Sequence, residues 1–395
     1  MTQLTKATYQ HRRGKMLSLM DAIDVDALIF TSADFFQFAT NFHTDVQTWE
    51  RPIFAVMPRN GAPFLVMNEL STNHVRFSLQ KEKLWANDIS FYAEHPRSID
   101  RLPLLSQLPE LLADRLQRAG LQRSRIGVEG GAAVITAVSK LLPEMTIRPC
   151  TAECRTLRWQ KHAEELTVME EVSSLSDWLQ DRYRENIRVG RLLQELDFSM
   201  SALFVEEAAK RFPGESIEVR TRTLSGPASA SPHGDGAACG QTIQRGDGIV
   251  NIIVPRLNGL AVENERTWFC GEPSDEQKRL WTVAKDANAA AMDAARAGNP
   301  VCAIDAAAQA VIEKAGCGQY IKHRTGHGMG VVNHEFPHDM AFSFRPLLDN
   351  EVYSIEPGIY VFGLGGFRLD DTVIIGQEPR CLTTTPRSLE YATVL

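Results

Sequence analysis

Two glutamates near the middle of the chain, Glu263 and Glu265, have the types and spacing that most clearly predict chemistry. Residues 248–255 form an apolar, β-branched run, Asn258-Gly259 is a strong hairpin signal, and a second predicted strand carries both glutamates. Alternate residues of a strand share a face, so the two carboxylates point the same way. In apolar surroundings they require a metal ion, an arginine, a shared proton or a cationic ligand. The alternative, a solvated strand face, is disfavoured by the apolar flanks.

A second group of candidates lies towards the C-terminus. Residues 324–337 read R-T-G-H-G-M-G-V-V-N-H-E-F-P, and the glycines beside His327 allow the backbone to approach a ligand closely. His334 lies in the same run, Glu356 in S-I-E-P-G, and Asp370 in G-G-F-R-L-D-D-T-V. A further histidine, His233, lies in a loop of small residues, 225–240, where a lone histidine is ordinarily a surface residue.

Together these runs resemble the creatinase, aminopeptidase P, prolidase and methionine aminopeptidase superfamily, which has the pita-bread fold. The resemblance covers residues 155–380 in order and the N-terminal half more loosely, and G-H-G-x-G is its most specific motif. It implies an α/β N-terminal domain over residues 1–154 and an α+β pita-bread catalytic domain over residues 155–395. The run L-R-W-Q-K at residues 157–161 is similar to the family's entry into the catalytic domain.

The local patterns agree with this organisation. Short apolar runs at residues 27–31, 53–57, 64–67 and 125–129 predict strands, and residues 7–25 and 104–119 predict helices, which together indicate an α/β domain. Beyond residue 164 an apolar stripe at helical spacing predicts a long helix packed on a core. Residues 275–298 and 304–315 predict two further packing helices.

The resemblance also assigns five metal-ligand positions, which read Ile252, Glu263, His327, Glu356 and Asp370. Metal-dependent members carry an Asp at the first position, and isoleucine cannot ligate a metal. A dinuclear centre needs oxygen ligands shared between two cations. The E-R-T run at residues 265–267 is similar to that of metal-free creatinase. We therefore expect no metal cofactor, with a single divalent ion at the last four positions as the alternative.

The resulting prediction is a metal-independent, creatinase-like hydrolase. It would cleave a non-peptide C–N bond of a small zwitterionic guanidino or amidino compound, or a cyclic amidine, of the creatine or ectoine kind. His233, Glu265 and Glu356 are the predicted catalytic residues, with His233 as general acid and base. In a variant of this mechanism Glu265 is the nucleophile. The predicted substrate-binding residues are Arg51, Glu263, His327, His334 and Asp370, and the carboxylates of the cluster grip the cation.

Arg51 ends an aromatic segment, residues 34–51, that reads either as core aromatics under a loop or as one lip of the binding site. Its guanidinium would hold a substrate carboxylate in a bidentate contact. The resemblance to creatinase-like dimers further implies a homodimer whose N-terminal domain contributes to the partner's active site.

Three other functions remain open at this point. The first is a metal-dependent Xaa-Pro aminopeptidase or prolidase, against which Ile252 argues. The second is a non-catalytic binding protein on the same fold, against which the retained histidines and carboxylates argue. The third is a lyase acting on an osmolyte-like zwitterion.

Composition limits the partners and the compartment. The chain has 395 residues and a net charge of −7, which disfavours binding to nucleic acid or to an anionic membrane and leaves a small-molecule substrate. Seven scattered cysteines without a C-x-x-C pair indicate reduced thiols and a cytoplasmic protein. We expect no signal peptide and no transmembrane segment.

Overall fold

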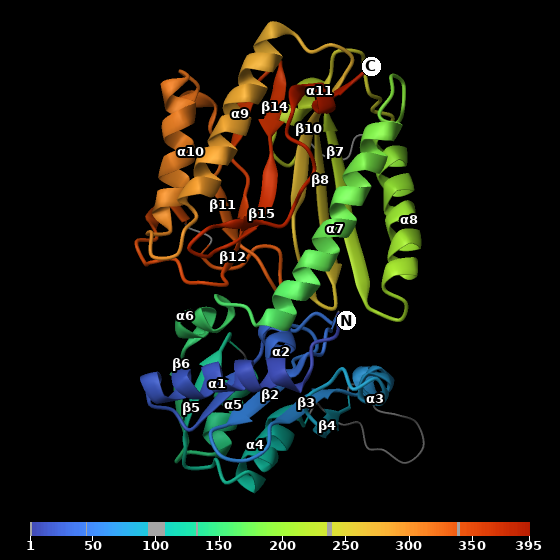
Figure 1. Cartoon of the computed structure of the whole chain (residues 1–395). Coiled ribbons are helices and arrows are strands. Elements are labelled where there is room, and N and C mark those ends of the chain that lie inside the picture. Colours follow the sequence, from blue (N-terminus) through green and yellow to red (C-terminus); the bar gives the residue numbers. More distant parts are fainter. Residues whose placement is uncertain (1, 45, 94–106, 132, 235–238, 338–339) are drawn as a thin grey trace. The chain divides into compact units, whose positions relative to one another are not determined.

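The computed structural model describes residues 2–44, 46–93, 107–131, 133–234, 239–337 and 340–395 (Figure 1). The chain divides into two compact units, one of residues 3–158 and the other of residues 159–395 together with Thr2. Each unit has its own sheet and its own apolar core. The domain boundary between residues 154 and 155 stays a prediction.

A six-stranded mixed sheet forms the first unit, with the strand order β4-β3-β2-β1-β5-β6. Its strands are β1 (Ala27–Phe30), β2 (Phe54–Pro58), β3 (Phe64–Asn68), β4 (Asp88–Tyr92), β5 (Arg125–Glu129) and β6 (Thr146–Pro149). The helices around it are α1 (Lys6–Ile23), α2 (Ala33–Thr40), α3 (Thr72–Gln80), α4 (Leu108–Arg118), α5 (Ala133–Leu141) and α6 (Thr151–Cys154). The α/β prediction for this unit is confirmed. The predicted start of α4, residues 104–106, lies outside the described residues.

The aromatic segment at residues 34–51 begins within helix α2, which the sequence did not predict. Glu129 accepts hydrogen bonds from two backbone N–H groups just before this helix, at 3.2 Å each. Phe35, Phe36 and Phe38 are buried to 3% exposure or less, as the reading of core aromatics requires. Trp49, beyond the helix, is 82% exposed.

The second unit is built on a nine-stranded sheet. Its main path runs β11-β12-β15-β10-β8-β7, with β9 beside β8, β16 beside β15 and β17 beside β10. The strands are β7 (Ile217–Ser225), β8 (Gly248–Leu257), β9 (Leu260–Ala261), β10 (Asn264–Cys270), β11 (Gly326–Gly328), β12 (Val352–Ile355), β15 (Asp370–Ile374), β16 (Arg380–Cys381) and β17 (Thr393–Val394). A separate hairpin consists of β13 (Gly358–Val361) and β14 (Gly365–Arg368). The pita-bread prediction is confirmed.

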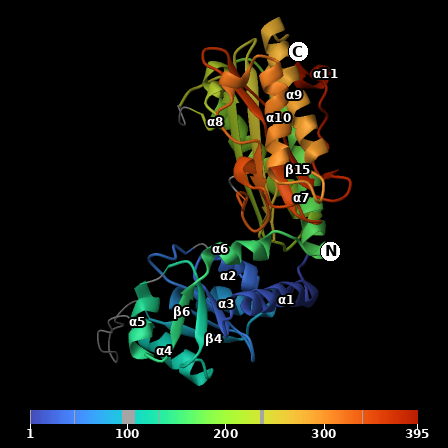
Figure 2. The ribbon, with the colours of Figure 1, turned by 90° about the vertical axis from the view of Figure 1, so that its left-hand side faces the viewer.

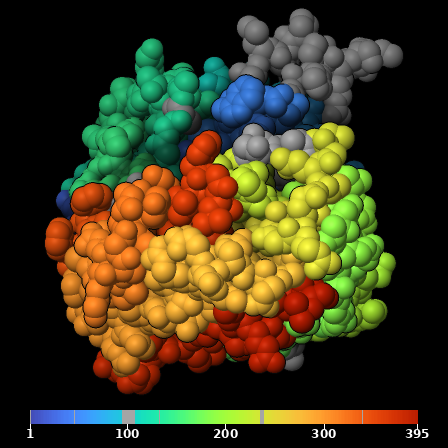
Figure 3. Space-filling model, turned by 90° about the horizontal axis from the view of Figure 1, so that it is seen from above, coloured from blue at the N-terminus to red at the C-terminus, as the bar shows by residue number. Residues whose placement is uncertain are grey.

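Long helices cover one face of this sheet. They are α7 (Ala163–Asn186), α8 (Leu193–Arg211), α9 (Asp275–Ala294) and α10 (Cys302–Lys314), with a short α11 (Leu389–Ala392) near the C-terminus (Figures 1 and 2). The apolar stripe predicted for the first of them is buried, and its reading as core is confirmed. Figure 3 shows α9 and α10 side by side on the surface, in gold and orange. Within the described ranges, no helix has the length and apolarity needed to cross a bilayer.

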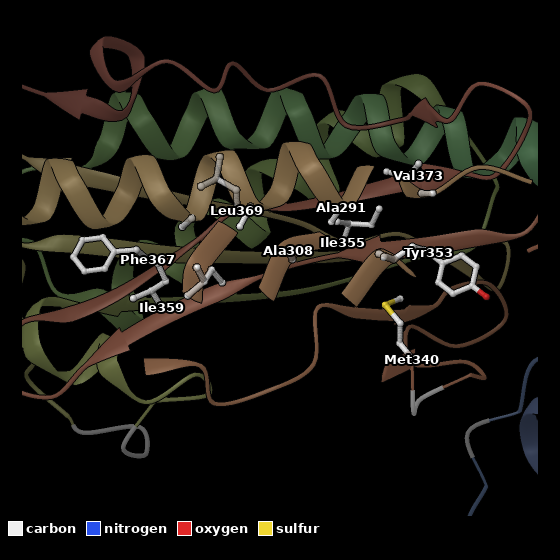
Figure 4. Packing of buried hydrophobic residues seen from close by; sticks show 14 of the residues in the cluster. Ala291, Ala308, Met340, Tyr353, Ile355, Ile359, Phe367, Leu369 and Val373 are labelled. Atoms are coloured by element: carbon white, nitrogen blue, oxygen red, sulfur yellow. The ribbon is translucent and has the colours of Figure 1, made fainter. Parts of the chain in front are cut away.

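The strands present different residues to their two faces. Tyr353 and Ile355 of β12 and Val373 of β15 lie in one core cluster with Ala291 of α9 and Ala308 of α10 (Figure 4). Because side chains alternate along a strand, the neighbours of these core residues point away from the helices. The opposite face of the sheet is therefore free to carry polar groups.

The predicted hairpin is confirmed. Asn258 and Gly259 have φ angles of 47° and 80°, and two consecutive positive φ values suit the two-residue turn that Asn-Gly favours. Leu257 pairs with Leu260 across the turn, and the same register continues to the pairing of Glu265 with Ile252. The turn therefore determines which β10 side chains face the helices and which face away.

Candidate active site

Strand register places the predicted carboxylates in one row on the helix-free face. Glu265 pairs with Ile252 on one side and with Asp370 on the other. Ser354 pairs with Thr372 and Ile355 with Asp371, and Glu356 follows directly after β12 on the same face as Ser354. Directly opposed residues of antiparallel strands share a face. Four strands thus align Ile252 and three carboxylates across the sheet.

A second row lies beside the first. His327 pairs with Ser354, and Ser354 pairs with Thr372. The Thr372 hydroxyl group accepts from the Glu263 backbone N–H at 2.9 Å and donates to the Glu263 carbonyl oxygen at 2.8 Å. The Nε2 atom of His327 lies 3.5 Å from Glu263 Oε2 and 3.5 Å from Glu356 Oε1. The structure therefore brings together all five ligand positions read from the sequence.

Three ligand atoms in this cluster are buried without a hydrogen-bond partner: Glu263 Oε2, His327 Nε2 and Asp370 Oδ2. Their residues are 4%, 0% and 0% exposed. The Nδ1 atom of His327 lies 3.0 Å from a carbonyl oxygen, that of Gly328, and must donate to it. Its Nε2 lone pair consequently faces two carboxylates. Buried lone pairs without a donor indicate a missing cation, and a backbone-anchored histidine is the usual arrangement of a metal ligand.

The charge state of the cluster agrees with this geometry. Burial raises the pKa of Glu263 well above its usual range, and the nearby Glu265 and Glu356 add to the effect. Burial also raises the pKa of Asp370, with Glu263 as the next cause. Burial lowers the pKa of His327 to about 3, so its ring is neutral near pH 7. The carboxylates therefore repel one another, and a divalent cation would relieve the repulsion.

Arg368 provides one positive charge, which the sequence reasoning missed. The Arg368 guanidinium contacts both oxygens of Glu265: Nη2 donates to Oε1 at 3.0 Å, and Nε contacts Oε2. Its Nη1 donates to the Tyr360 hydroxyl at 3.1 Å. The same hydroxyl lies 2.7 Å from His323 Nε2. Burial raises the pKa of Glu265 to about 7, against the lowering effect of Arg368. The available signal was an arginine two residues before Asp370 in the G-G-F-R-L-D-D run.

The second histidine of the motif, His334, stacks on His327 with ring centroids 3.8 Å apart. Arg324 Nη2 lies 3.1 Å from His334 Nδ1. Arginine can only donate, so Nδ1 accepts and the neutral ring carries its proton on Nε2. Burial and then Arg324 lower the pKa of His334 to about 4. His334 is thus a neutral hydrogen-bond donor beside the ligand cluster.

A cavity of about 260 Å³ opens onto this cluster. Its lining consists of Ser231, Pro232, His233, Lys322, His323, Arg324, His334, Glu356 and Arg368. The predicted residues His233, His334 and Glu356 therefore share one cavity. The backbone carbonyl of His233 accepts a hydrogen bond from Arg222 at 2.7 Å, and burial lowers the pKa of its ring. Its role in proton transfer stays a prediction.

Arg51 belongs to the first unit, where its guanidinium lies 2.9 Å from the Glu50 carboxylate. Its contact with a substrate carboxylate stays a prediction, as does the homodimer that would accompany such a contact.

The fold and the row of carboxylates and histidine define a two-domain protein of the pita-bread superfamily. Residues 167–377 match metallopeptidase family M24, and residues 12–160 match the creatinase/prolidase N-terminal domain. The chain belongs to metallopeptidase family M24.

Individual relatives carry dipeptidase names. The chain is 32% identical to an Xaa-Pro dipeptidase of Pyrococcus furiosus over 236 residues, which are 60% of this chain and 66% of that protein. The crystal structure of dipeptidase PepE from Mycobacterium ulcerans is similar with a TM-score of 0.80 and 25% identity, over 99% of both chains. A dipeptidase structure from Pyrococcus horikoshii OT3 has a TM-score of 0.80 and 26% identity, over 97% of this chain and 100% of that one.

These findings overturn the predicted function. The prediction of a metal-independent, creatinase-like hydrolase acting on C–N bonds other than peptide bonds was wrong, because the family is one of metallopeptidases and the relatives are named dipeptidases. The physical reason lies at Glu265. The prediction requires a cationic substrate to neutralise the Glu265 carboxylate, whereas the protein's own Arg368 already pairs with that carboxylate. The expectation of no metal fails with it, since a carboxylate–histidine group suited to a metal remains.

Proposed function

We propose that this protein is a metal-dependent dipeptidase that hydrolyses the peptide bond of small dipeptides, with Xaa-Pro dipeptides as the first class to test. The observation that carries the proposal is a set of three buried ligand atoms without a hydrogen-bond partner, on Glu263, His327 and Asp370. Glu263 belongs to both groups of side chains that could hold a metal ion, one with His327 and one with Asp370. Membership in a metallopeptidase family supports it. The cavity of about 260 Å³ supports a small substrate, because ligand pockets usually span roughly 300–1,000 Å³.

Four side chains would hold the ion: Glu263, His327, Glu356 and Asp370. They offer carboxylate oxygens and one imidazole nitrogen, a donor set that suits Mn²⁺, Co²⁺ or Zn²⁺. Ser354 donates to Asp370 Oδ1 at 2.8 Å, and the Gly328 carbonyl oxygen orients His327, so two of the four ligands are held by outer contacts. A divalent ion at this position supplies Lewis acidity and a nucleophilic water at neutral pH.

The remaining residues of the cavity act on the substrate. His334 presents its Nε2–H as a fixed donor for the oxygen of the scissile carbonyl, where negative charge develops during hydrolysis. Lys322 and Arg324 line the same cavity and offer positive charge to the C-terminal carboxylate of a dipeptide. Glu356 and His233 are the candidates for moving the proton to the leaving amine.

The test is hydrolysis by protein that has been stripped with a chelator and reloaded with Mn²⁺, Co²⁺ or Zn²⁺. We expect Ala-Pro or Leu-Pro to be cleaved only after reloading, and Glu263→Gln to reduce the rate at least 100-fold. Glu276→Gln, on the exposed first turn of α9, is the matched control and should leave the rate unchanged. Ala-Leu tests whether proline is required. Failure of every metal form on every dipeptide would overturn the proposal.

A further inference from the structure

We infer that this site takes one divalent ion instead of two, because the Arg368 guanidinium supplies the positive charge beside Glu265 and Ile252. This inference rests on the metal dependence proposed above. It concerns the end of the carboxylate row that lies nearest to β8.

That end of the row is apolar. Ile252, which faces Glu265 across the sheet, is 5% exposed and lies in a cluster with Leu224, Val250 and Val254. None of these four side chains carries an atom that can bind a cation. A divalent ion placed here would have oxygen ligands on one side only, whereas such ions require a shell of several oxygens or nitrogens.

Glu265, the carboxylate opposite Ile252, is already paired. Ligand atoms of Glu263, Glu265 and Asp370 lie within 4.8 Å of one another, so these three residues alone would form a second ion position. However, both oxygens of Glu265 contact Arg368, whose side chain is 2% exposed. A guanidinium group stays protonated in proteins, so a positive charge is always present beside this carboxyl group.

Arg368 is held in place from several directions. Its backbone N–H donates to the Thr267 hydroxyl, which donates in turn to the Arg368 carbonyl oxygen, both at 2.8 Å. Its Nη1 donates to Tyr360, which His323 contacts at 2.7 Å. A second divalent ion would have to compete with this buried, fixed positive charge for the Glu265 carboxylate, which disfavours its binding.

The charge balance points the same way. With Glu265 neutralised by Arg368, three carboxylates remain around the unpartnered atoms, on Glu263, Glu356 and Asp370. One divalent ion leaves a residual charge of about −1 there, which a substrate or bound water can accommodate. The geometry therefore assigns one exchangeable ion and one permanent, covalently attached cation to this centre.

The inference is tested by metal content and by Mn²⁺ electron paramagnetic resonance, neither of which depends on activity. We expect one Mn²⁺ per chain and the six-line spectrum of an isolated ion. The double variant I252D/E265T adds a carboxylate at the apolar end and removes the carboxylate that Arg368 occupies. It should bind two ions per chain and show the spectrum of an exchange-coupled pair.

The matched control is I252N/E265T, which makes the same change at residue 265 but adds an amide in place of the new carboxylate, and which should stay at one ion. An exchange-coupled pair of ions in the unaltered protein would overturn the inference and leave the proposed function standing. An unaltered protein that binds no ion would overturn the proposed function itself. If the double variants do not fold, the unaltered protein alone still decides between one ion and two.

Discussion

At the scale of single residues, the orientation of His334 depends on Arg324. The guanidinium donates to Nδ1 at 3.1 Å and to the Gly326 carbonyl oxygen at 3.1 Å, so it is fixed by two contacts. It thereby keeps the His334 proton on Nε2, the nitrogen that we propose to face the substrate. Arg324 is in this sense a positioning residue.

This dependence predicts a coupled loss of activity. His334→Phe should lower kcat by about 100-fold, since it removes one fixed donor to the developing charge. Arg324→Met should cause a smaller loss of kcat and, because Arg324 also faces the substrate carboxylate, a rise in KM. Steady-state kinetics of both variants and of the double variant would measure the coupling. Fully additive effects would contradict a role of Arg324 through His334.

The same scale shows what the sequence could and could not predict. Alternation along a strand and an Asn-Gly turn suffice to place Glu263 and Glu265 on one face. No local pattern pairs Glu265 with Arg368, because the two residues lie 103 positions apart and meet only through the folding of the β13–β14 hairpin. Without that partner, a cationic substrate was the apparent counter-charge, and the functional prediction failed there.

At the scale of elements, the turn that carries His334 is tied to the start of the second unit. Lys161 Nζ lies 3.3 Å from Glu335 Oε2, and their side chains are 5% and 2% exposed. Glu335 also pairs with Gly328, one residue after His327. A side chain at Gly330 would meet both Lys161 and Glu335 at 2.9 Å. The backbone hydrogen bond joins the two histidine-bearing segments, and the buried ion pair ties them to the start of the second unit.

The buried position of this pair predicts its contribution to stability. Lys161→Met removes the buried ammonium group that contacts Glu335 and should lower the free energy of unfolding by about 3–5 kcal/mol. Lys278→Met, which removes the partner of Glu272 in an exposed ion pair, should cost less than about 1 kcal/mol. Urea denaturation of both variants provides the measurement. Equal losses in the two variants would contradict the role assigned to the Lys161–Glu335 pair.

The sequence predicts the type of most helices and strands better than it predicts which distant segments they contact. Helix α7 and the β8–β10 hairpin followed from apolar spacing and from turn residues that act locally. Helix α2 was not predicted, because three phenylalanines among polar residues give no clean helical stripe. Its entry is fixed by Glu129, about 100 residues distant, which no local pattern indicates.

At the scale of the whole molecule, acid stability depends on histidines that fold in the neutral form. Burial, and then Arg368, lower the pKa of His323 to about 4 from an ordinary value of 6.5. The unfolded chain therefore binds a proton between these pH values and the folded chain does not. Stability is retained above about pH 6.5 and is lost as the pH falls towards 4.

This linkage predicts a pH-dependent effect of His323→Gln. Between pH 7.5 and pH 4.5 the unaltered protein should lose about 2 kcal/mol more unfolding free energy than the variant does. The full shift would correspond to roughly 3 kcal/mol, and the partial exposure of the ring reduces it. Denaturant unfolding at both pH values measures the difference. Parallel losses in the two proteins would exclude His323 as a source of the acid sensitivity.

The two faces of the second sheet carry different residues, one set for packing and one for the site, and this separation affects how such proteins can evolve. Packing on the helices uses one set of side chains, and catalysis uses the alternate set on the same strands. A replacement at a position such as Ile252 can therefore change the reaction centre without disturbing the architecture. Lineages built on this scaffold are free to diversify in chemistry while their three-dimensional form stays recognisable.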